Sequence, residues 1–229
     1  MIKKQLGVLA GSVMLATSAN AALVGGNGLT DSSAVLVLST AGNGAFIVDV
    51  TGQIGSDFSI DLTAATAALG GTIDQFALFQ NIGGTSNVYS SALTGYIDVN
   101  GGVIYAGETA GTTLAGNDLV STQSSIQSFI GGAAEGFNAE GTAGDLDGTS
   151  VGTAAFGTGL FTSSGSVANV YQQTLVDASD AVLSQVGAAG YTASIDGATF
   201  TASAVPVPAA AWLFGSALLG LGVVRRKKA

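Results

Sequence analysis

The chain has no cysteine and no histidine among its 229 residues. Without thiols it forms no disulfide, so its stability must come from packing and from sheet hydrogen bonds. A thiolate nucleophile and an imidazole base are both absent, and no imidazole can activate a serine hydroxyl. These absences argue against catalysis, and we expect a chain that is not an enzyme and holds no organic cofactor.

Lysine and arginine are missing from the whole segment 22–204. All six cations lie outside it, at Lys3, Lys4 and 225–228, whereas all fifteen acids lie within it. Separated from both ends, this segment would be a polyanion with fifteen acids and no cation. Such a field repels phosphate backbones, and the segment has no cation to release counterions from DNA. We therefore expect no nucleic-acid partner.

The first 21 residues have the layout of a secretory signal peptide. Lys3 and Lys4 precede an uncharged apolar run at 6–17, and the small residues Ala19 and Ala21 frame a cleavage site. The run is too short to span a bilayer. The sequence predicts a signal helix, export, and cleavage after Ala21.

A second apolar segment, 209–224, is followed at once by the basic residues 225–228. As a helix rising about 1.5 Å per residue, this segment would reach about 24 Å, slightly less than a hydrocarbon core of about 30 Å. The basic residues would stay on the cytoplasmic side, and Trp212 would lie near the opposite interface. The sequence therefore predicts a transmembrane helix that holds the body outside the inner membrane.

A proline motif directly precedes this apolar segment. The motif residues and their partners in the tail are Val205, Pro206, Pro208, Ala209, Trp212, Arg225 and Arg226. Taken together, the region 205–229 resembles the PEP-CTERM sorting signal in its V-P-x-P-A variant. It departs from the name-giving Pro-Glu-Pro because Val207 occupies the middle position.

The resemblance implies a route and a setting. In this family an exosortase, a membrane enzyme resembling a cysteine protease, recognises the tail and cuts near the proline motif. Such proteins usually occur in Gram-negative bacteria that make exopolysaccharide. The resemblance implies the secretion machinery and an exosortase as partners, an inner-membrane intermediate, and delivery to the outer surface or the extracellular matrix.

The body, 22–204, reads as one domain of short strands joined by glycine turns. Three pairs of strand-like runs flank Asn43-Gly44, Asn100-Gly101-Gly102 and Asp196-Gly197. In the last pair Tyr191, Ala193 and Ile195 fall on one face, and Ala198, Phe200 and Ala202 return on the same face. The paired runs are 34–39 with 45–51, 96–99 with 103–106, and 191–195 with 198–202.

Further runs complete the expected fold. We expect strands at 58–62, 73–80 and 87–91, and a helix in the run from Asp118 to Ile130. The stretch 167–186 has helical spacing, although a strand over 167–174 fits it equally. The segment 131–165 is low in complexity and is expected to be a Gly/Ala/Thr/Ser-rich surface excursion. The predicted class is mainly β: an antiparallel β-sandwich, jelly-roll-like or similar, with one or two short helices.

Two acidic patterns suggest chemistry. Asp145 and Asp147 form a D-x-D-G fragment that could face a calcium ion, although the ligand set of a full calcium loop is incomplete. The pairs Asp57/Asp61 and Asp177/Asp180 have the composition of a glycosidase dyad, but solvated surface charge is the simpler interpretation. Neither pattern outweighs the reading of a non-catalytic chain.

The sequence as a whole predicts an exported, acidic surface or matrix protein with a structural or adhesive role, for example in biofilm or floc formation. The alternative from another class is a carbohydrate- or calcium-dependent binding module. An extracellular hydrolase comes third, because it would need acids clustered in a cleft and the body has no tryptophan to stack against sugars.

Overall fold

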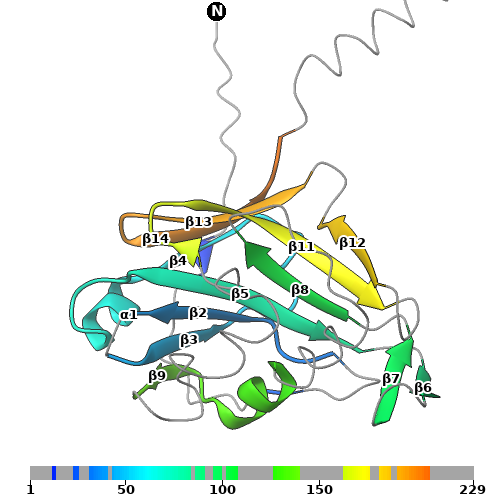
Figure 1. The fold of residues 1–229 in the computed structure, drawn as a ribbon. Coiled ribbons are helices and arrows are strands. Elements are labelled where there is room, and N and C mark those ends of the chain that lie inside the picture. Colours follow the sequence, from blue (N-terminus) through cyan, green and yellow to red (C-terminus); the bar gives the residue numbers. More distant parts are fainter. Residues whose placement is uncertain are drawn as a thin grey trace, which may run out of the picture.

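The computed structural model describes residues 12–13, 23–25, 31–40, 43–83, 86–90, 95–99, 102–107, 126–139, 162–175, 181–186 and 190–206. These residues fold mainly into antiparallel β-structure with two short helices (Figure 1). This confirms the prediction of a mainly β chain with one or two short helices. The helices are α1 (Thr63–Ala68) and residues 126–132. The strands are β1 (Ser12–Val13), β2 (Val35–Ser39), β3 (Ala45–Asp49), β4 (Phe58–Asp61), β5 (Gln75–Ile82), β6 (Ser86–Ser90), β7 (Gly95–Val99), β8 (Gly102–Gly107), β9 (Gly136–Asn138), β10 (Thr162–Ser163), β11 (Val167–Leu175), β12 (Ala181–Gln185), β13 (Tyr191–Asp196) and β14 (Thr199–Ala204).

Twelve of these strands form one sheet. Its order is β1-β4-β14-β13-β11-β8-β5-β2-β3-β9, with β10 beside β5 and β12 beside β11. Every described pairing in it is antiparallel except that of β1 with β4. Strands β6 and β7 pair with each other in a second, two-stranded sheet.

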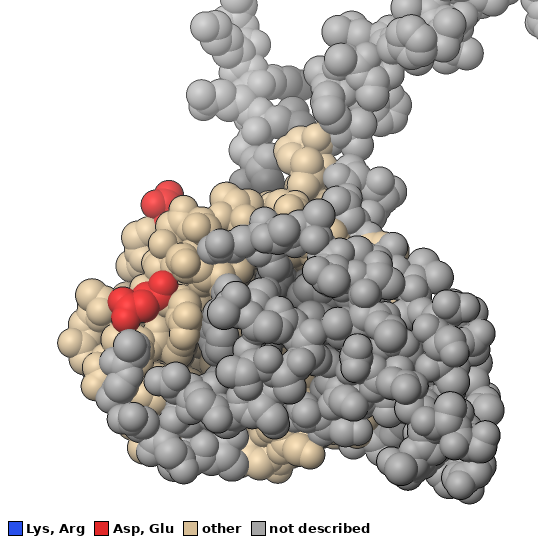
Figure 2. All heavy atoms as spheres, viewed as in Figure 1, with Lys and Arg blue, Asp and Glu red and all other residues tan. Residues whose placement is uncertain are grey.

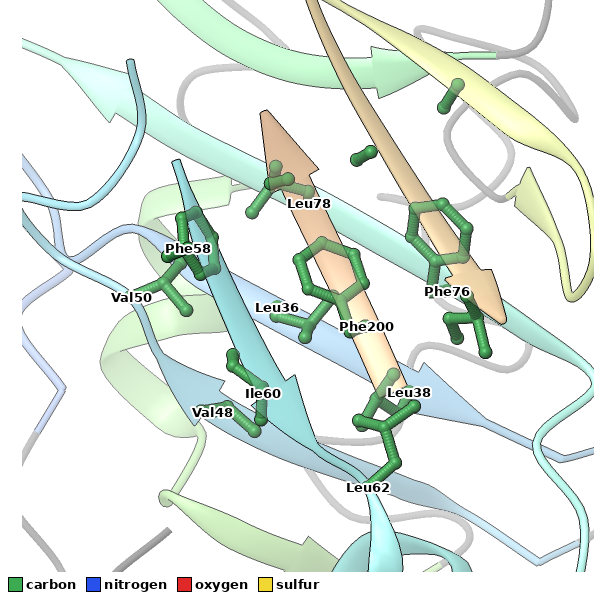
Figure 3. Packing of buried hydrophobic residues seen from close by; sticks show 14 of the residues in the cluster. Leu36, Leu38, Val48, Val50, Phe58, Ile60, Leu62, Phe76, Leu78 and Phe200 are labelled. Atoms are coloured by element: carbon green, nitrogen blue, oxygen red, sulfur yellow. The ribbon is translucent and has the colours of Figure 1, made fainter. Parts of the chain in front are cut away.

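The large sheet bends so that two groups of its strands share one core. We call β2, β3 and β5 the inner half, and β4, β11, β13 and β14 the outer half. The ring of Phe200 in the outer half lies 5.5 Å from that of Phe76 in the inner half and 5.8 Å from that of Phe58. Figure 3 shows side chains of both halves meeting there. Burial of a large apolar side chain stabilises a fold by about 1.5–3 kcal/mol.

The hairpin β13-β14 shows how the outer half is built. Ile195 pairs with Phe200 and Ala193 pairs with Ala202, and all four side chains are buried, as the sequence predicts. The turn, however, consists of Gly197 and Ala198, one residue later than expected, so Ala198 is exposed. Gly197 has a φ of 58°, a conformation that glycine adopts without a Cβ clash.

The inner half is buried on both faces. All five residues of β2 are buried, and the face that points away from the shared core is covered by the helix at 126–132, drawn in green beneath β2 and β3 in Figure 1. Phe129 of this helix lies 5.7 Å from Phe79 of β5, ring centroid to ring centroid. Gly25 packs against the same helix so closely that a Cβ would lie 2.6 Å from the carbonyl oxygen of Gln127. A continuous apolar strand such as β2 is the pattern expected of a strand covered twice.

Several predicted strands are confirmed, but their partners differ. The predicted runs at 58–62, 73–80 and 87–91 correspond to β4, β5 and β6. The predicted runs at 96–99 and 103–106 are also strands, β7 and β8, but the predicted hairpin between them is wrong. β7 pairs with β6, whereas β8 lies between β5 and β11, where both of its edges find long partners. The first predicted hairpin is present as β2-β3, with a five-residue loop, 40–44, in place of a two-residue turn.

The helical interpretation of 167–186 is wrong. This stretch forms β11 and β12, so the strand alternative holds. Pairing with β8, β12 and β13 outweighs the weak helical spacing, because tertiary context overrides local propensity. The predicted helix in 118–130 is present over 126–130, and its earlier residues lie outside the described ones.

The two ends of the chain are described only in part. Ser12 and Val13, inside the predicted signal segment, form the short strand β1, and the rest of that segment lies outside the described residues. In the described part of the chain, no helix has the length and apolar character needed to cross a membrane. The apolar segment 209–224 lies outside that part.

Candidate functional site

The strongest candidate site is the junction at which the chain leaves the body after β14. Val205 and Pro206, the first two residues of the predicted sorting motif, follow β14 directly, and both are exposed. The other residues predicted for signal cleavage, sorting and calcium binding lie outside the described residues. These are Ala19, Ala21, Asp145, Asp147, Pro208, Ala209, Trp212, Arg225 and Arg226.

Backbone N–H groups at the end of β14 are bonded on both sides. The N–H of Ala204 donates to Oδ1 of Asp57 at 2.9 Å, and the N–H of Val205 donates to the carbonyl oxygen of Gly190 at 3.0 Å. Ala204 also pairs with Tyr191, the first residue of β13. The ladder therefore continues through Val205 and stops at Pro206, which has no N–H to donate.

The side chain of Tyr191 also holds the junction in place. Its side chain is 1% exposed, and its hydroxyl donates to the carbonyl oxygen of Ser56. Burial, and next the charge of the Asp57 carboxylate, raise the pKa of Tyr191 from 10.0 to about 12, with the backbone of Gly55 partly opposing them. The phenol therefore stays neutral over the physiological range. We call Ser56, Asp57, Gly190, Tyr191, Ala204 and Val205 the junction clasp.

The structure separates the roles of the acidic pair Asp57/Asp61. Asp57 accepts the N–H of Ala204 at the junction, whereas Oδ1 of Asp61 accepts the N–H of Thr63 at 2.8 Å, at the start of α1. The hydroxyl and the N–H of Thr63 lower the pKa of Asp61 below its ordinary value. Each carboxylate thus satisfies a backbone donor, and both are exposed rather than set in a cleft. The second pair, Asp177 and Asp180, lies outside the described residues.

A second feature lies on the side of the outer half that faces away from the core. Its strands there carry short hydroxyl side chains in register: Thr201 stands between Ser59 of β4 and Ser194 of β13, and Ser203 pairs with Thr192. All are exposed or half-buried, and Figure 2 shows acids but no lysine or arginine among the described atoms of the face it presents. We call this set the hydroxyl face. Its residues are Ser59, Asp61, Asn169, Thr192, Ser194, Asp196, Thr199, Thr201 and Ser203.

The described residues hold no group of three or more acids that could bind a metal ion. Sequence reasoning missed the junction clasp, because the contact between Asp57 and Ala204 joins residues 147 positions apart. It also passed over Gly148-Thr149-Ser150-Val151-Gly152, which has the G-x-S-x-G spacing of a nucleophile elbow. This segment lies outside the described residues, and the chain has no histidine to act as its base.

Comparisons of the chain with protein-family models, with curated proteins and with solved structures found no match.

Proposed function

We propose that this chain is an exported cell-surface or extracellular-matrix protein with a structural or adhesive role, in biofilm or floc cohesion, in a Gram-negative bacterium. In this proposal residues 1–21 are a signal peptide, 22–204 form a secreted antiparallel β-sandwich, and 205–229 are a PEP-CTERM-like tail that an exosortase processes. The tail would hold the body at the inner membrane until it is cut. The body is not an enzyme.

The observation that carries the proposal is the position of the end of β14 relative to the proline motif. Among the described residues the last strand, β14, ends at Ala204, and the proline motif begins at the next residue, Val205. The proposed boundary between the body and the tail, drawn from the proline motif, therefore falls directly after the last described strand. A tail that can be cut without damage to the body is what a sorting signal requires.

The other predicted cut is equally compatible with the fold. Leu23 is buried, and the carbonyl oxygen of Val24 accepts the N–H of Ser33 at 2.7 Å, so the body includes the residues just after Ala21. Cleavage there would remove β1 alone from the described sheet and leave β4 as its edge strand. Exposed Asp57 and Asp61 flank that edge, and charged residues of this kind discourage edge-to-edge aggregation.

The test is the intact mass and the location of the native protein in cells with and without their exosortase. The proposal expects a mature form that begins near Ala22, lacks 209–229, and reaches the surface or the medium only when the enzyme is present. Retention of 225–229 in the inner membrane in both strains would contradict it and would indicate a tail-anchored periplasmic protein.

The hydroxyl face supports a second candidate, a carbohydrate-binding module. Hydroxyl and carboxylate groups can exchange hydrogen bonds with sugar hydroxyls, and the absence of cations from the body favours a neutral polysaccharide over an anionic one. Affinity electrophoresis in gels containing the exopolysaccharide of the host would test this candidate, with the double variant Thr199→Val and Thr201→Val for comparison. Equal retardation of the variant and the wild type would exclude this face, and a requirement for added calcium would point to Asp145 and Asp147.

A further inference from the structure

The junction clasp limits where the chain can be cut. A protease needs several residues of substrate backbone free of other hydrogen bonds, so the bonding and burial of the backbone decide which peptide bonds are open to attack. The N–H groups of Ala204 and Val205 are both bonded, on opposite sides, to Asp57 and Gly190. Peptide bonds up to Ala204–Val205 therefore belong to the folded body.

The stretch between the clasp and the apolar segment is short. Ala209 follows Val205 by four residue positions, so even a fully extended chain spans at most about 14 Å between them. If 209–224 lies in the membrane, the junction end of the body must be held close to the membrane surface. A membrane protease then meets a substrate in which the backbone free of hydrogen bonds to the body begins at Pro206.

We propose that the junction clasp sets the upstream limit of C-terminal processing: the processing protease cuts beyond Pro206, and the mature protein keeps both Val205 and Pro206. This inference rests on the proposed function, because it needs a protease that removes the tail. Asp57 acts as a positioning residue: its carboxylate holds the Ala204 amide in the sheet and does not touch the bond that is cut.

The first test is the C-terminal residue of the mature protein, read from its intact mass in cells that have the processing enzyme. The wild type is expected to end at Pro206 or later. Asp57→Ala is expected to add shorter species that end between Ser203 and Val205, because the freed end of β14 becomes open to other envelope proteases. A wild-type C-terminus at or before Val205 would overturn the inference.

Two matched variants separate the clasp from general destabilisation. Asp61→Ala removes an exposed carboxylate from the end of β4, but that carboxylate bonds Thr63 and not the junction, so the mature mass is expected to stay that of the wild type. Asp57→Asn keeps an acceptor oxygen for Ala204 and is also expected to keep the wild-type mass. Shorter species in Asp61→Ala equal to those in Asp57→Ala would assign the effect to loss of stability and overturn the inference.

A second test does not depend on the processing enzyme. The purified full-length chain is digested with elastase, which cuts after small residues, and cleavage after Ala202 and Ala204 is followed by mass. Asp57→Ala is expected to be cut there about fivefold faster than either the wild type or Asp61→Ala. Loss of one net hydrogen bond raises the population in which the end of β14 is open by about this factor. If no tail removal occurs in cells, the proposed function fails; if the elastase rates of all three are equal, the clasp fails.

Discussion

The two halves of the large sheet share the same hydrogen-bond ladder but differ in how their faces are buried. The inner half is covered on both faces, and its strand β2 is apolar at four successive positions, Val35 to Leu38. At β4, β13 and β14 the outer half is buried on one face only, and β13 alternates between buried and half-buried residues from Tyr191 to Ile195. The inner half is therefore enclosed within the body, whereas the outer half leaves a face and an end, the hydroxyl face and the junction clasp, free for interaction.

The largest effect should come from the core that both halves share. Phe200→Ala removes a fully buried ring that contacts Phe58 and Phe76, and it is expected to lower the free energy of unfolding by about 3–5 kcal/mol. Its neighbour on the open face, Thr201→Ala, should change that energy by less than about 0.5 kcal/mol. Urea unfolding followed by circular dichroism measures both. Equal losses would contradict the assignment of the two faces.

The packing of the helix at 126–132 on the second face of the inner half can be weakened separately from the shared core. Phe129→Ala, in the helix at 126–132, removes the ring that packs on Phe79 and is expected to cost about 3 kcal/mol. The exposed neighbour Ser128→Ala is the control and should be neutral. Thermal unfolding measures the pair. A loss below about 1 kcal/mol for Phe129→Ala would mean that the inner half does not depend on this helix.

A polar defect in the inner half gives a prediction of opposite sign. The side chain of Asn81 is fully buried, and neither its amide nitrogen nor its oxygen has a hydrogen-bond partner among the described residues. Its backbone is bonded independently, to Ser32. Asn81→Val removes the unpaired amide and suits a strand, so it is expected to raise stability by about 1–2 kcal/mol. Destabilisation on chemical unfolding would show that the amide has a role in the folded protein.

The outer half should respond to alkaline pH through Tyr191. Because folding raises the pKa of Tyr191 from 10.0 to about 12, the neutral phenol stabilises the fold fully below pH 10, and this contribution is lost as the pH rises from 10 through 12. After allowance for solvent screening near the surface, the loss is expected to be about 1–2 kcal/mol. Tyr191→Phe cannot ionise, so its stability should fall less steeply over this range. Parallel pH profiles for the two proteins would refute the assignment.

Much of this fold could be predicted because the residue pattern within one strand often suffices to identify that strand. The alternation around Phe200 and Ala202 placed the right residues in the core, and the apolar run 34–39 predicted a strand. The structure confirms that strand as β2 and shows that all its residues are buried. Each of these features depends on residues that are close together in the sequence.

The features that were missed depend on partners far apart in the chain. Nothing local shows that β7 pairs with β6 and not with β8, or that Val167 to Leu175 is held as a strand by β8 and β13. The junction clasp was missed for the same reason, since Asp57 reads as an ordinary surface acid until β14 is placed beside it. The contacts that hold the C-terminal end of the body could be seen only in the fold.

The smallest effect expected is that of a single charge on the hydroxyl face. Bonds from Thr63 lower the pKa of Asp61, so the ionised carboxylate stabilises the fold above its ordinary pKa of 3.8, and this contribution is lost as the pH falls below that value. Asp61→Asn should therefore unfold at a slightly lower temperature than the wild type at pH 6, with the difference narrowing towards pH 3. Because Asp61 is exposed, solvent screens its charge, and the shift in melting temperature should be far smaller than that of Phe200→Ala. A shift as large as the core variant's would mean that the open face of the outer half carries stability as well as interaction, and the contrast between the two halves would fail.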